Sequence, residues 1–214
     1  PHLAEIYKAA EGAVDANVYA QMAKAVREAR DRRFDRLAVH TRFAALADTM
    51  AEEIGATGMP LSICTACASG VSAIQLGVEA IRRGETDAAI CMGVDATVHP
   101  EGLTRFSLLS ALSTHVDPPH KASRPFAKDR NGFVVAEGGA ALVLESSDAA
   151  TARGARILGY VRGCGERADH FHRTRSKPDG SAIIGAIQNT LADAGIAPDE
   201  IDYVNAHGTG TPEN

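Results

Sequence analysis

The stretch that most constrains this chain is residues 59–93, where two short apolar runs flank a segment rich in small residues. The first run, MPLSICTA, leads into SGVSAIQLGVEAIRRG, which has helical spacing of apolar residues and ends at Gly84. The second run is DAAICMG. Short apolar runs bounded by turn residues are typical of buried strands, and strands that are joined through a helix pair in parallel. Residues 59–93 are therefore predicted to form a parallel strand–helix–strand unit of a layered α/β domain.

The same alternation continues on both sides of this unit. Helices are predicted over 17–33, 42–54, part of 99–113, 146–154 and 181–196, and further strands over 138–146, 156–165 and 201–211. Ser146 or Ser147 is expected to cap its helix. Residues 114–131 and 166–180 are polar and are predicted to be loops. We therefore expect an α/β fold.

Charge and hydropathy exclude several classes of protein. The net charge of −5 gives no overall basic field for nucleic acid. No apolar run approaches the roughly 20 residues of a membrane-spanning helix, and the N-terminus is too polar for a signal peptide. Four cysteines are too few for a disulfide scaffold, so a reducing cytoplasm is the expected compartment. Because the chain begins with Pro1 and stops just after a glycine-rich stretch, we expect a piece of a longer polypeptide.

Cys64 and Cys67 form a C-x-x-C pattern within SICTACASG. This pattern fits a redox pair, half of a zinc site, or two structural cysteines. A fourth interpretation is favoured. Cys67 lies where a predicted strand turns sharply into a helix, and free N–H groups at a helix start stabilise a thiolate and an oxyanion. Cys67 is thus predicted to be an exposed nucleophile, and Cys64 to be buried in the preceding strand.

A second candidate site lies in VNAHGTGTPEN, where His207 follows a predicted strand and enters a glycine loop. Gly208 and Gly210 let the backbone turn and approach a ligand closely. Thr209 and Thr211 alternate with them, so that their hydroxyls can point the same way. A histidine and a helix-start cysteine, distant in sequence, are the usual partners in thiol catalysis.

Between these two motifs, residues 124–145 mix charged and apolar side chains. Arg124, Asp129, Arg130 and Glu137 are predicted to brace loops through salt bridges, and direct catalysis is the alternative.

Taken together, these motifs resemble the β-ketoacyl synthases, the condensing enzymes of fatty-acid and polyketide assembly. The family's nucleophile motif is matched by TACAS at 65–69, and its first histidine motif by NAHGTGT at 205–211. Residues 123–138 match a third block, with Ala127 where the family usually has Asp and Ala136 where it usually has Gly. SLLSALST and ADHFHRT are also similar to the family, although Arg175 and Ser176 follow the latter in place of small residues or proline. The matching motifs extend over 59–214.

The resemblance implies the thiolase-like layered fold, αβαβα, with N- and C-terminal halves related by duplication and here incomplete. It suggests a helical N-terminal segment over 1–57, loosely matched. The rest of the first half, with Cys67, would be 58–145, and the start of the second half, with His207, would be 146–214. The family's second histidine, a lysine and a gating phenylalanine would lie beyond Asn214.

The resemblance also implies an acyltransferase that performs a decarboxylative condensation without metal or cofactor. Cys67 would carry the acyl group, and His207 would assist malonyl decarboxylation. Thr209 and Thr211 would bind the pantetheine arm, and Phe106 would line the acyl pocket. The implied partner is acyl carrier protein, with a homodimer as the usual assembly. Arg173, Arg175 and Lys177 either flank an entrance for this acidic partner or form a solvated loop.

Fatty-acid elongation is the favoured pathway. Polyketide or specialised lipid synthesis is the first alternative. A non-catalytic chain-length subunit is a weaker one, because such subunits typically lack the cysteine. A coenzyme-A-dependent thiolase would share the fold, but the NAHGTGT motif belongs to the carrier-dependent branch.

Overall fold

The computed structural model describes residues 20, 24, 43–172 and 175–214. The chain divides into two compact units, Pro1–Ser62 and Ile63–Asn214. In the first unit, α4 spans Phe43–Ile54 and is followed by Gly55 in a left-handed conformation, with φ of 69°. This confirms the predicted helix over 42–54. The helix predicted over 17–33 lies outside the described residues, except for Ala20 and Lys24.

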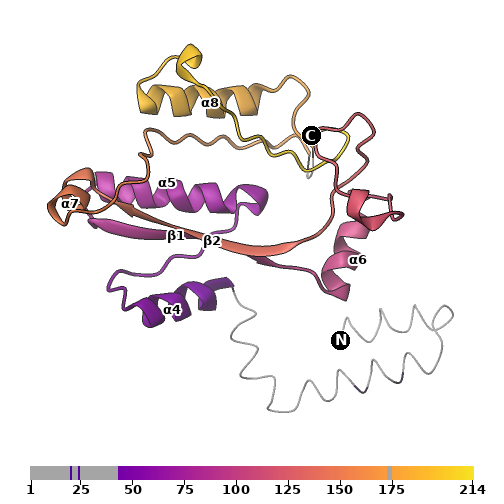
Figure 1. Ribbon diagram of the computed structural model, residues 1–214, viewed down its shortest axis with the longest axis horizontal. Helices are drawn as coiled ribbons and strands as arrows, with labels where there is room; N and C mark the ends of the chain where they lie inside the picture. The colour runs from indigo at the N-terminus through magenta and orange to yellow at the C-terminus, as the bar shows by residue number, and fades with distance from the viewer. Residues whose placement is uncertain (1–19, 21–23, 25–42, 173–174) are drawn as a thin grey trace. The chain divides into compact units, whose positions relative to one another are not determined.

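The second unit is built on an antiparallel pair of strands (Figure 1). Strand β1, Ala88–Ala96, pairs along its whole length with β2, Glu137–Glu145, so that Ala88 lies opposite Glu145 and Ala96 opposite Glu137. Each strand overlaps a predicted apolar run, β1 with residues 87–93 and β2 with residues 138–146. The neighbour of β1 is antiparallel, however, so the parallel strand–helix–strand unit predicted over 59–93 is wrong within the described part of the chain.

Helix α5, Ser69–Arg82, packs along β1 through glycines. A Cβ atom on Gly77 would lie 2.5 Å from Cys91 Sγ, and one on Gly70 would lie 3.9 Å from Gly93 Cα. The buried apolar side chains of this contact are Val78 and Cys91. The small residues that the sequence places in this helix thus bring it close to the sheet, which fixes where its N-terminus lies.

Three further α-helices of the second unit agree with the predictions, and three short 3-10 helices among the described residues were not predicted. They are α6, Pro100–Leu108; α7, Ser147–Ala152; and α8, Ser181–Ala194, together with the 3-10 helices η2, Ala66–Ala68, η3, Pro119–Lys121, and η4, Pro198–Glu200. Ser146 caps α7 by accepting a hydrogen bond from the Ala149 N–H over 3.2 Å. Helix α8 lies between two left-handed glycines, Gly180 and Gly195. No helix among the residues that the structure covers is long and apolar enough to cross a bilayer.

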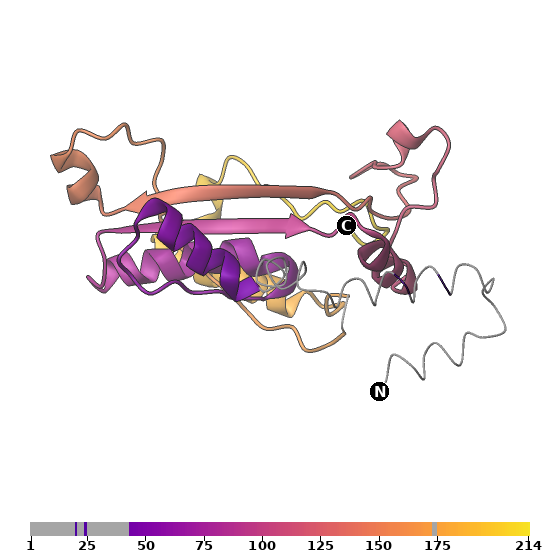
Figure 2. The same cartoon turned by 90° about the horizontal axis from the view of Figure 1, so that it is seen from below.

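Three predicted strands, at 59–66, 156–165 and 201–211, are not strands in the structure. A strand is held by hydrogen bonds to a neighbour, and these segments have no ladder partner among the described residues. The 156–165 segment runs close along α8 instead, on the same side of the sheet as α5 (Figures 1 and 2). Cβ atoms on Gly163 and Gly165 would lie 2.5 Å from Ala194 N and 2.6 Å from Ala186 O.

Candidate active site

Cys67 is the central residue of η2, the short turn that leads directly into α5. Ala66 has a φ of 54°, a left-handed conformation that costs a residue with a side chain about 1–2 kcal/mol. Two hydrogen bonds close the turn. The Thr65 N–H donates to Ser69 Oγ over 2.9 Å, and the Ser69 hydroxyl donates to the Ala66 carbonyl over 2.6 Å. The turn exposes Cys67 at the start of a helix of 14 residues, where free N–H groups stabilise negative charge.

Cys64 is exposed rather than buried, and it does not lie in a strand. The prediction of a core cysteine is therefore wrong for the structure, because residues 61–65 have no neighbouring strand among the described residues to cover them. The two cysteines still differ in setting, since only Cys67 lies in the turn that starts α5.

The other two cysteines are more enclosed. Cys91 is buried in β1 and Cys164 is half-buried, and in each case burial is the main cause that raises the pKa of the thiol. Neither is poised as a nucleophile, because a raised pKa favours the unreactive thiol over the thiolate. No three His, Cys, Asp or Glu residues gather around a possible metal position in the described ranges.

His207 is exposed and is followed by a loop whose glycines take left-handed conformations. Gly208 has a φ of 55° and Gly210 a φ of 82°. The hydroxyls of Thr209 and Thr211 lie 3.0 Å apart and form a hydrogen bond, so the two threonines point the same way, as their spacing predicts.

Arg130 holds this glycine loop from the 124–138 block. Its Nε donates to the carbonyls of Thr211 and Asn214 over 2.9 and 3.0 Å, and Nη2 donates to that of Pro212 over 2.7 Å. Gly132 adds a backbone bond, because its N–H donates to the Gly210 carbonyl over 2.9 Å. These contacts bring together two sequence motifs that are about eighty residues apart.

Of the other predicted bracing residues, Arg124 and Asp129 form the expected salt bridge, whereas Glu137 is held by a hydrogen bond from a backbone N–H. Arg124 pairs with Asp129, and the pKa of the Asp129 carboxyl is lowered by a hydrogen bond from its own backbone N–H and by the charge of Arg124. Glu137 accepts a hydrogen bond from the Val98 N–H over 3.0 Å. Phe106 is half-buried and meets Phe133 edge to face, with 5.3 Å between ring centroids.

Phe126 is a neighbour of the histidine motif that the sequence analysis missed. It has a φ of 62°, unusual for an aromatic residue, and a Cβ on Gly208 would lie 2.7 Å from Cζ of its ring. Only Gly at position 208 therefore leaves this ring in place. In the sequence, the one indication that Phe126 matters is its place in the third block, residues 123–138, within the sequence Arg-Pro-Phe.

A shallow cavity of about 370 Å³ lies at the start of α8, where its lining includes Arg167, Asp169, His170 and Lys177. Asp169 accepts hydrogen bonds from the Lys177 and Phe171 N–H groups over 2.9 and 3.0 Å, and these bonds lower the pKa of its carboxyl. Lys177 lines this cavity and Arg175 is exposed, so an entrance and a solvated loop both stay open as interpretations of this segment. Arg173 lies outside the described residues.

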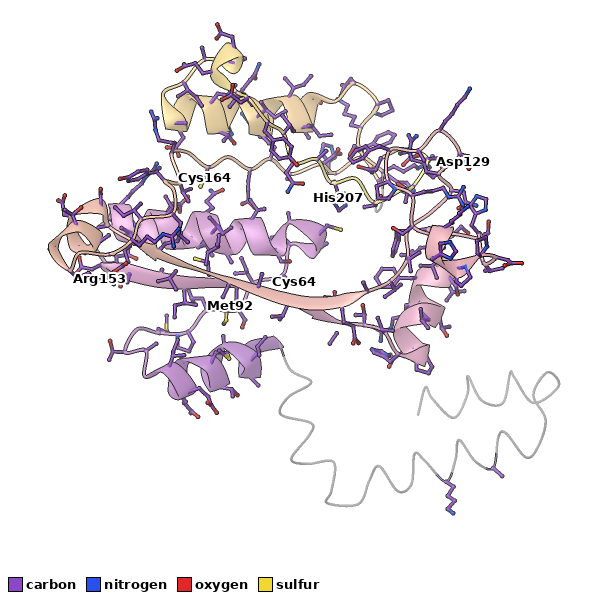
Figure 3. All side chains as sticks on the ribbon, viewed as in Figure 1. Cys64, Met92, Asp129, Arg153, Cys164 and His207 are labelled. Carbon is purple, nitrogen blue, oxygen red and sulfur yellow. The ribbon has the colours of Figure 1, made fainter. Side chains whose placement is uncertain are left out.

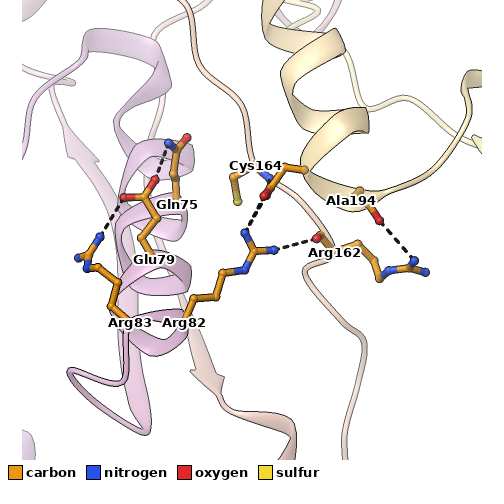
Figure 4. A network of polar contacts seen from close by, with 8 residues as sticks. Gln75, Glu79, Arg82, Arg83, Arg162, Cys164 and Ala194 are labelled. Atoms are coloured by element: carbon orange, nitrogen blue, oxygen red, sulfur yellow. Dashed lines mark hydrogen bonds and ion pairs between the residues drawn. The ribbon is translucent and has the colours of Figure 1, made fainter.

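Arg82, at the far end of α5 from Cys67, ties this helix to the second half of the chain (Figure 4). Its guanidinium donates to both carboxylate oxygens of Asp193, over 2.9 and 2.8 Å, and to the Arg162 carbonyl over 2.9 Å. Asp193 in turn accepts a hydrogen bond from the Cys164 N–H over 2.8 Å. Nothing in the sequence indicates this contact, because its members are spread over 111 positions.

The nucleophile turn and the histidine loop remain separate clusters. No hydrogen bond joins Cys67 to His207 within the described residues. Figure 3 shows the positions of Cys64, just ahead of the turn, and of His207 on the ribbon. Cys67 follows a left-handed alanine that hydrogen bonds hold in place, and the loop after His207 is held by Arg130 and Gly132. Both exposed side chains thus lie on a braced backbone, and the strained alanine is typical of a functional site.

Comparison with known proteins agrees with this arrangement. Residues 10–150 match the family described as β-ketoacyl synthase, N-terminal domain, and residues 158–214 match β-ketoacyl synthase, C-terminal domain. The N-terminal match begins well ahead of residue 59, where the recognisable motifs start.

Individual relatives come from two kinds of pathway. The chain is 42% identical to the tetracenomycin polyketide synthase ketoacyl synthase alpha subunit of Streptomyces glaucescens, over 77% of this chain and 39% of the relative. It is also 42% identical to 3-oxoacyl-[acyl-carrier-protein] synthase 2 of Coxiella burnetii, over 72% of this chain and 37% of the relative. The chain therefore spans less than half the length of the curated relatives that it matches.

Solved structures give the same family. One is a type II polyketide acyl-carrier protein in complex with its ketosynthase bound to a hexaketide. It matches with a TM-score of 0.78 and 34% identity, over 81% of this chain and 43% of that one. The ishigamide ketosynthase/chain length factor matches with a TM-score of 0.73 and 39% identity, over 81% and 41%. The predicted thiolase-like α/β fold is thus confirmed, and the chain belongs to the β-ketoacyl synthase family.

Proposed function

We propose that the protein containing this chain catalyses decarboxylative condensation of an acyl thioester with a malonyl thioester. The observation that carries the proposal is the setting of Cys67, exposed in a strained turn at the N-terminus of α5. A thiol mounted in this way is suited to form a covalent acyl intermediate. The braced loop after His207 supports a second role for that residue.

In the first step, Cys67 Sγ attacks the carbonyl carbon of the acyl thioester. The bond from carbon to the donor sulfur breaks, the donor leaves as a thiol that carries the proton, and the acyl group remains on Cys67. The backbone N–H of Cys67 stabilises the oxyanion of the tetrahedral intermediate.

In the second step, the malonyl thioester loses CO2, and the electron pair of the broken carbon–carbon bond forms an enolate. Neutral His207 donates a hydrogen bond to the enolate oxygen. The enolate carbon attacks the acyl carbonyl, and the bond from carbon to Cys67 Sγ breaks. The released Cys67 thiolate takes up a proton from solvent, which replaces the one lost in the first step. The product is a 3-oxoacyl thioester that is two carbons longer, and no metal or organic cofactor is consumed.

Other residues serve binding. Thr209 and Thr211, whose hydroxyls lie together, bind the amide groups of a pantetheine arm. Phe106 lines the acyl pocket, and Arg124, Asp129, Arg130 and Glu137 brace the surrounding loops. The thioesters are carried by acyl carrier protein, and the protein acts as a cytoplasmic homodimer.

Fatty-acid elongation is the first candidate pathway, supported by similarity to 3-oxoacyl-[acyl-carrier-protein] synthases. A polyketide pathway is the second, supported by similarity to the tetracenomycin ketoacyl synthase alpha subunit. The two differ in product. Purified full-length protein given a saturated acyl carrier and malonyl carrier should make a single 3-oxoacyl extension if it elongates fatty acids. Retention and repeated extension of poly-3-oxo chains would favour the polyketide pathway.

The proposed division of roles is tested by release of labelled CO2 from malonyl carrier. The Cys67→Gln variant should retain decarboxylation, because it cannot accept an acyl group but keeps His207. His207→Ala should lose most of the CO2 release. Loss of decarboxylation in Cys67→Gln, or its retention in His207→Ala, would contradict these assignments.

A further inference from the structure

A chain of side-chain hydrogen bonds leads from the nucleophile turn to Glu166, almost one hundred residues further along the chain. Ser72 lies in the first turns of α5 and is only 4% exposed. Its hydroxyl donates to Glu166 Oε1, and its oxygen lies 2.9 Å from Thr65 Oγ1. Thr65 is the residue two positions before Cys67.

The chemistry of these groups fixes the order of the bonds. An ionised carboxylate only accepts hydrogen bonds, so the one hydroxyl proton of Ser72 points to Glu166. The Ser72 oxygen is then free to accept, and the Thr65 hydroxyl is the donor. The hydrogen bonds therefore run from Thr65 to Ser72 and from Ser72 to Glu166. The second bond is the stronger of the two, because its acceptor is a charged carboxylate.

Thr65 is also joined to the turn through its backbone. Its N–H donates to Ser69 Oγ, and Ser69 donates to the carbonyl of Ala66, the residue with φ of 54°. A left-handed alanine persists only where its surroundings hold it in place. The same hydrogen-bond system thus contacts the strained residue immediately before Cys67 and Glu166 in the second half of the chain.

We propose that Glu166 is a positioning residue for Cys67, acting through Ser72 and Thr65 to hold the nucleophile turn in its reactive geometry. The proposal rests on the function proposed above, because its effect is on acylation of Cys67. Glu166 does not touch the substrate. It fixes the direction of the Cys67 backbone N–H and Sγ, both of which must face one carbonyl group.

The structure provides a matched control at the other end of the same helix. Arg82 and Asp193 also join α5 to the second half of the chain, but they lie at the C-terminal end of α5, away from Cys67. Loss of this pair should loosen the packing of α5 against the second half of the chain without disturbing the turn. Comparison of the two ends separates positioning of the nucleophile from general stability.

The experiment measures two reactions of Cys67 in the full-length protein. Acylation by an acyl-N-acetylcysteamine thioester requires an aligned oxyanion site, whereas alkylation by iodoacetamide requires only an accessible thiolate. A small misplacement of a reacting group costs up to about a hundredfold, so we expect Glu166→Ala and Ser72→Ala to lower acylation by about tenfold and alkylation by less than about twofold. Glu166→Gln, which keeps an acceptor oxygen, should restore most of the acylation rate.

Two further variants complete the test. The double variant Ser72→Ala/Glu166→Ala should be no slower than either single variant, since both act through one bond. Asp193→Ala should lower the melting temperature but leave the ratio of acylation to alkylation unchanged. If Glu166→Ala does not fold, Thr65→Val removes the first donor of the series at nearly constant shape and should show the same tenfold loss of acylation.

The outcomes are distinct. An unchanged ratio of the two rates in Glu166→Ala, or equal losses in Glu166→Ala and Asp193→Ala, would overturn the positioning role. Additive losses in the double variant would also overturn it. The same assay is first run on the unsubstituted protein. If that protein is not acylated at Cys67, the proposed function itself is contradicted.

Discussion

The N–H of Gly132 donates a hydrogen bond to the carbonyl of Gly210 over 2.9 Å, and both residues have a positive φ that disfavours a side chain, 152° and 82°. A Cβ on Gly132 would lie 2.4 Å from the carbonyl carbon of Leu112, and one on Gly210 would lie 3.2 Å from the carbonyl oxygen of Gly132. Two glycines from distant motifs therefore meet backbone to backbone. Their contact fixes the loop that begins with His207 to the block that contains Arg130.

Gly132→Ala should be strongly destabilising. The clash is with main-chain atoms that cannot rotate away, so the backbone must shift, and overpacking of this kind typically costs about 1–3 kcal/mol. The prediction is checked by urea unfolding of the full-length protein and by its condensation rate. Gly195→Ala is the control, because Gly195 also has positive φ, at 66°, but nothing lies within 4 Å of its Cβ position. Equal losses of stability in the two variants would show that the contact with Leu112 is unimportant.

Arg130→Lys should reduce condensation although it keeps the charge. The Arg130 guanidinium donates hydrogen bonds to three backbone carbonyls of residues 211–214. A lysine ammonium cannot reproduce this planar arrangement of donors. We expect a fall in kcat of about tenfold or more, with little change in melting temperature, because misplaced groups around a reaction cost rate. Arg153→Lys is the control, since Arg153 is exposed and pairs with Glu145, which lies outside the histidine loop and the 124–138 block. Full activity in Arg130→Lys would contradict the bracing role.

The fold was predictable where local pattern decides the structure. The apolar run at 88–93 became β1, and the alternation of small and apolar residues over 69–84 became α5. Ser146 caps its helix because a serine side chain satisfies a free N–H wherever a helix starts.

Strand pairing was not predictable in the same way. The ladder between β1 and β2 joins residues about 41 to 57 positions apart, and the sequence of neither strand indicates which strand it pairs with. Cys64 illustrates the consequence, because its burial depends on neighbouring strands that the described residues do not supply. The two motifs of the site, around Cys67 and His207, could be predicted from their residue types and spacing. The bonds that join Glu166 and Asp193 to α5 could not be predicted, because they depend on tertiary contact alone.

Asp193 should make stability depend on pH in the acid range. The hydrogen bond from Arg82, and then that from the Cys164 N–H, hold the pKa of its carboxyl below the usual 3.8. A lowered pKa in the folded state stabilises the protein above the unfolded-state pKa, and this stabilisation is lost as pH falls through the folded-state value. The free energy of unfolding should therefore differ most between the unsubstituted protein and Asp193→Asn above about pH 5, and the difference should narrow below pH 3.8.

Urea unfolding at a series of pH values checks this prediction. Asp179→Asn is a useful comparison, because the pKa of Asp179 is lowered to about 2, first by Lys177 and then by Ser181, at a site that does not join α5 to α8. A difference between Asp193→Asn and the unsubstituted protein that stays constant down to pH 3 would contradict the role of the Arg82 pair.

The most direct test of the account is mass spectrometry of the full-length protein after reaction with an acyl carrier thioester and, separately, with a cerulenin-like electrophile. We predict a single adduct on Cys67 in each case, absent in Cys67→Ser and retained in Cys64→Ala. An adduct on Cys64, or no adduct on either cysteine, would contradict it.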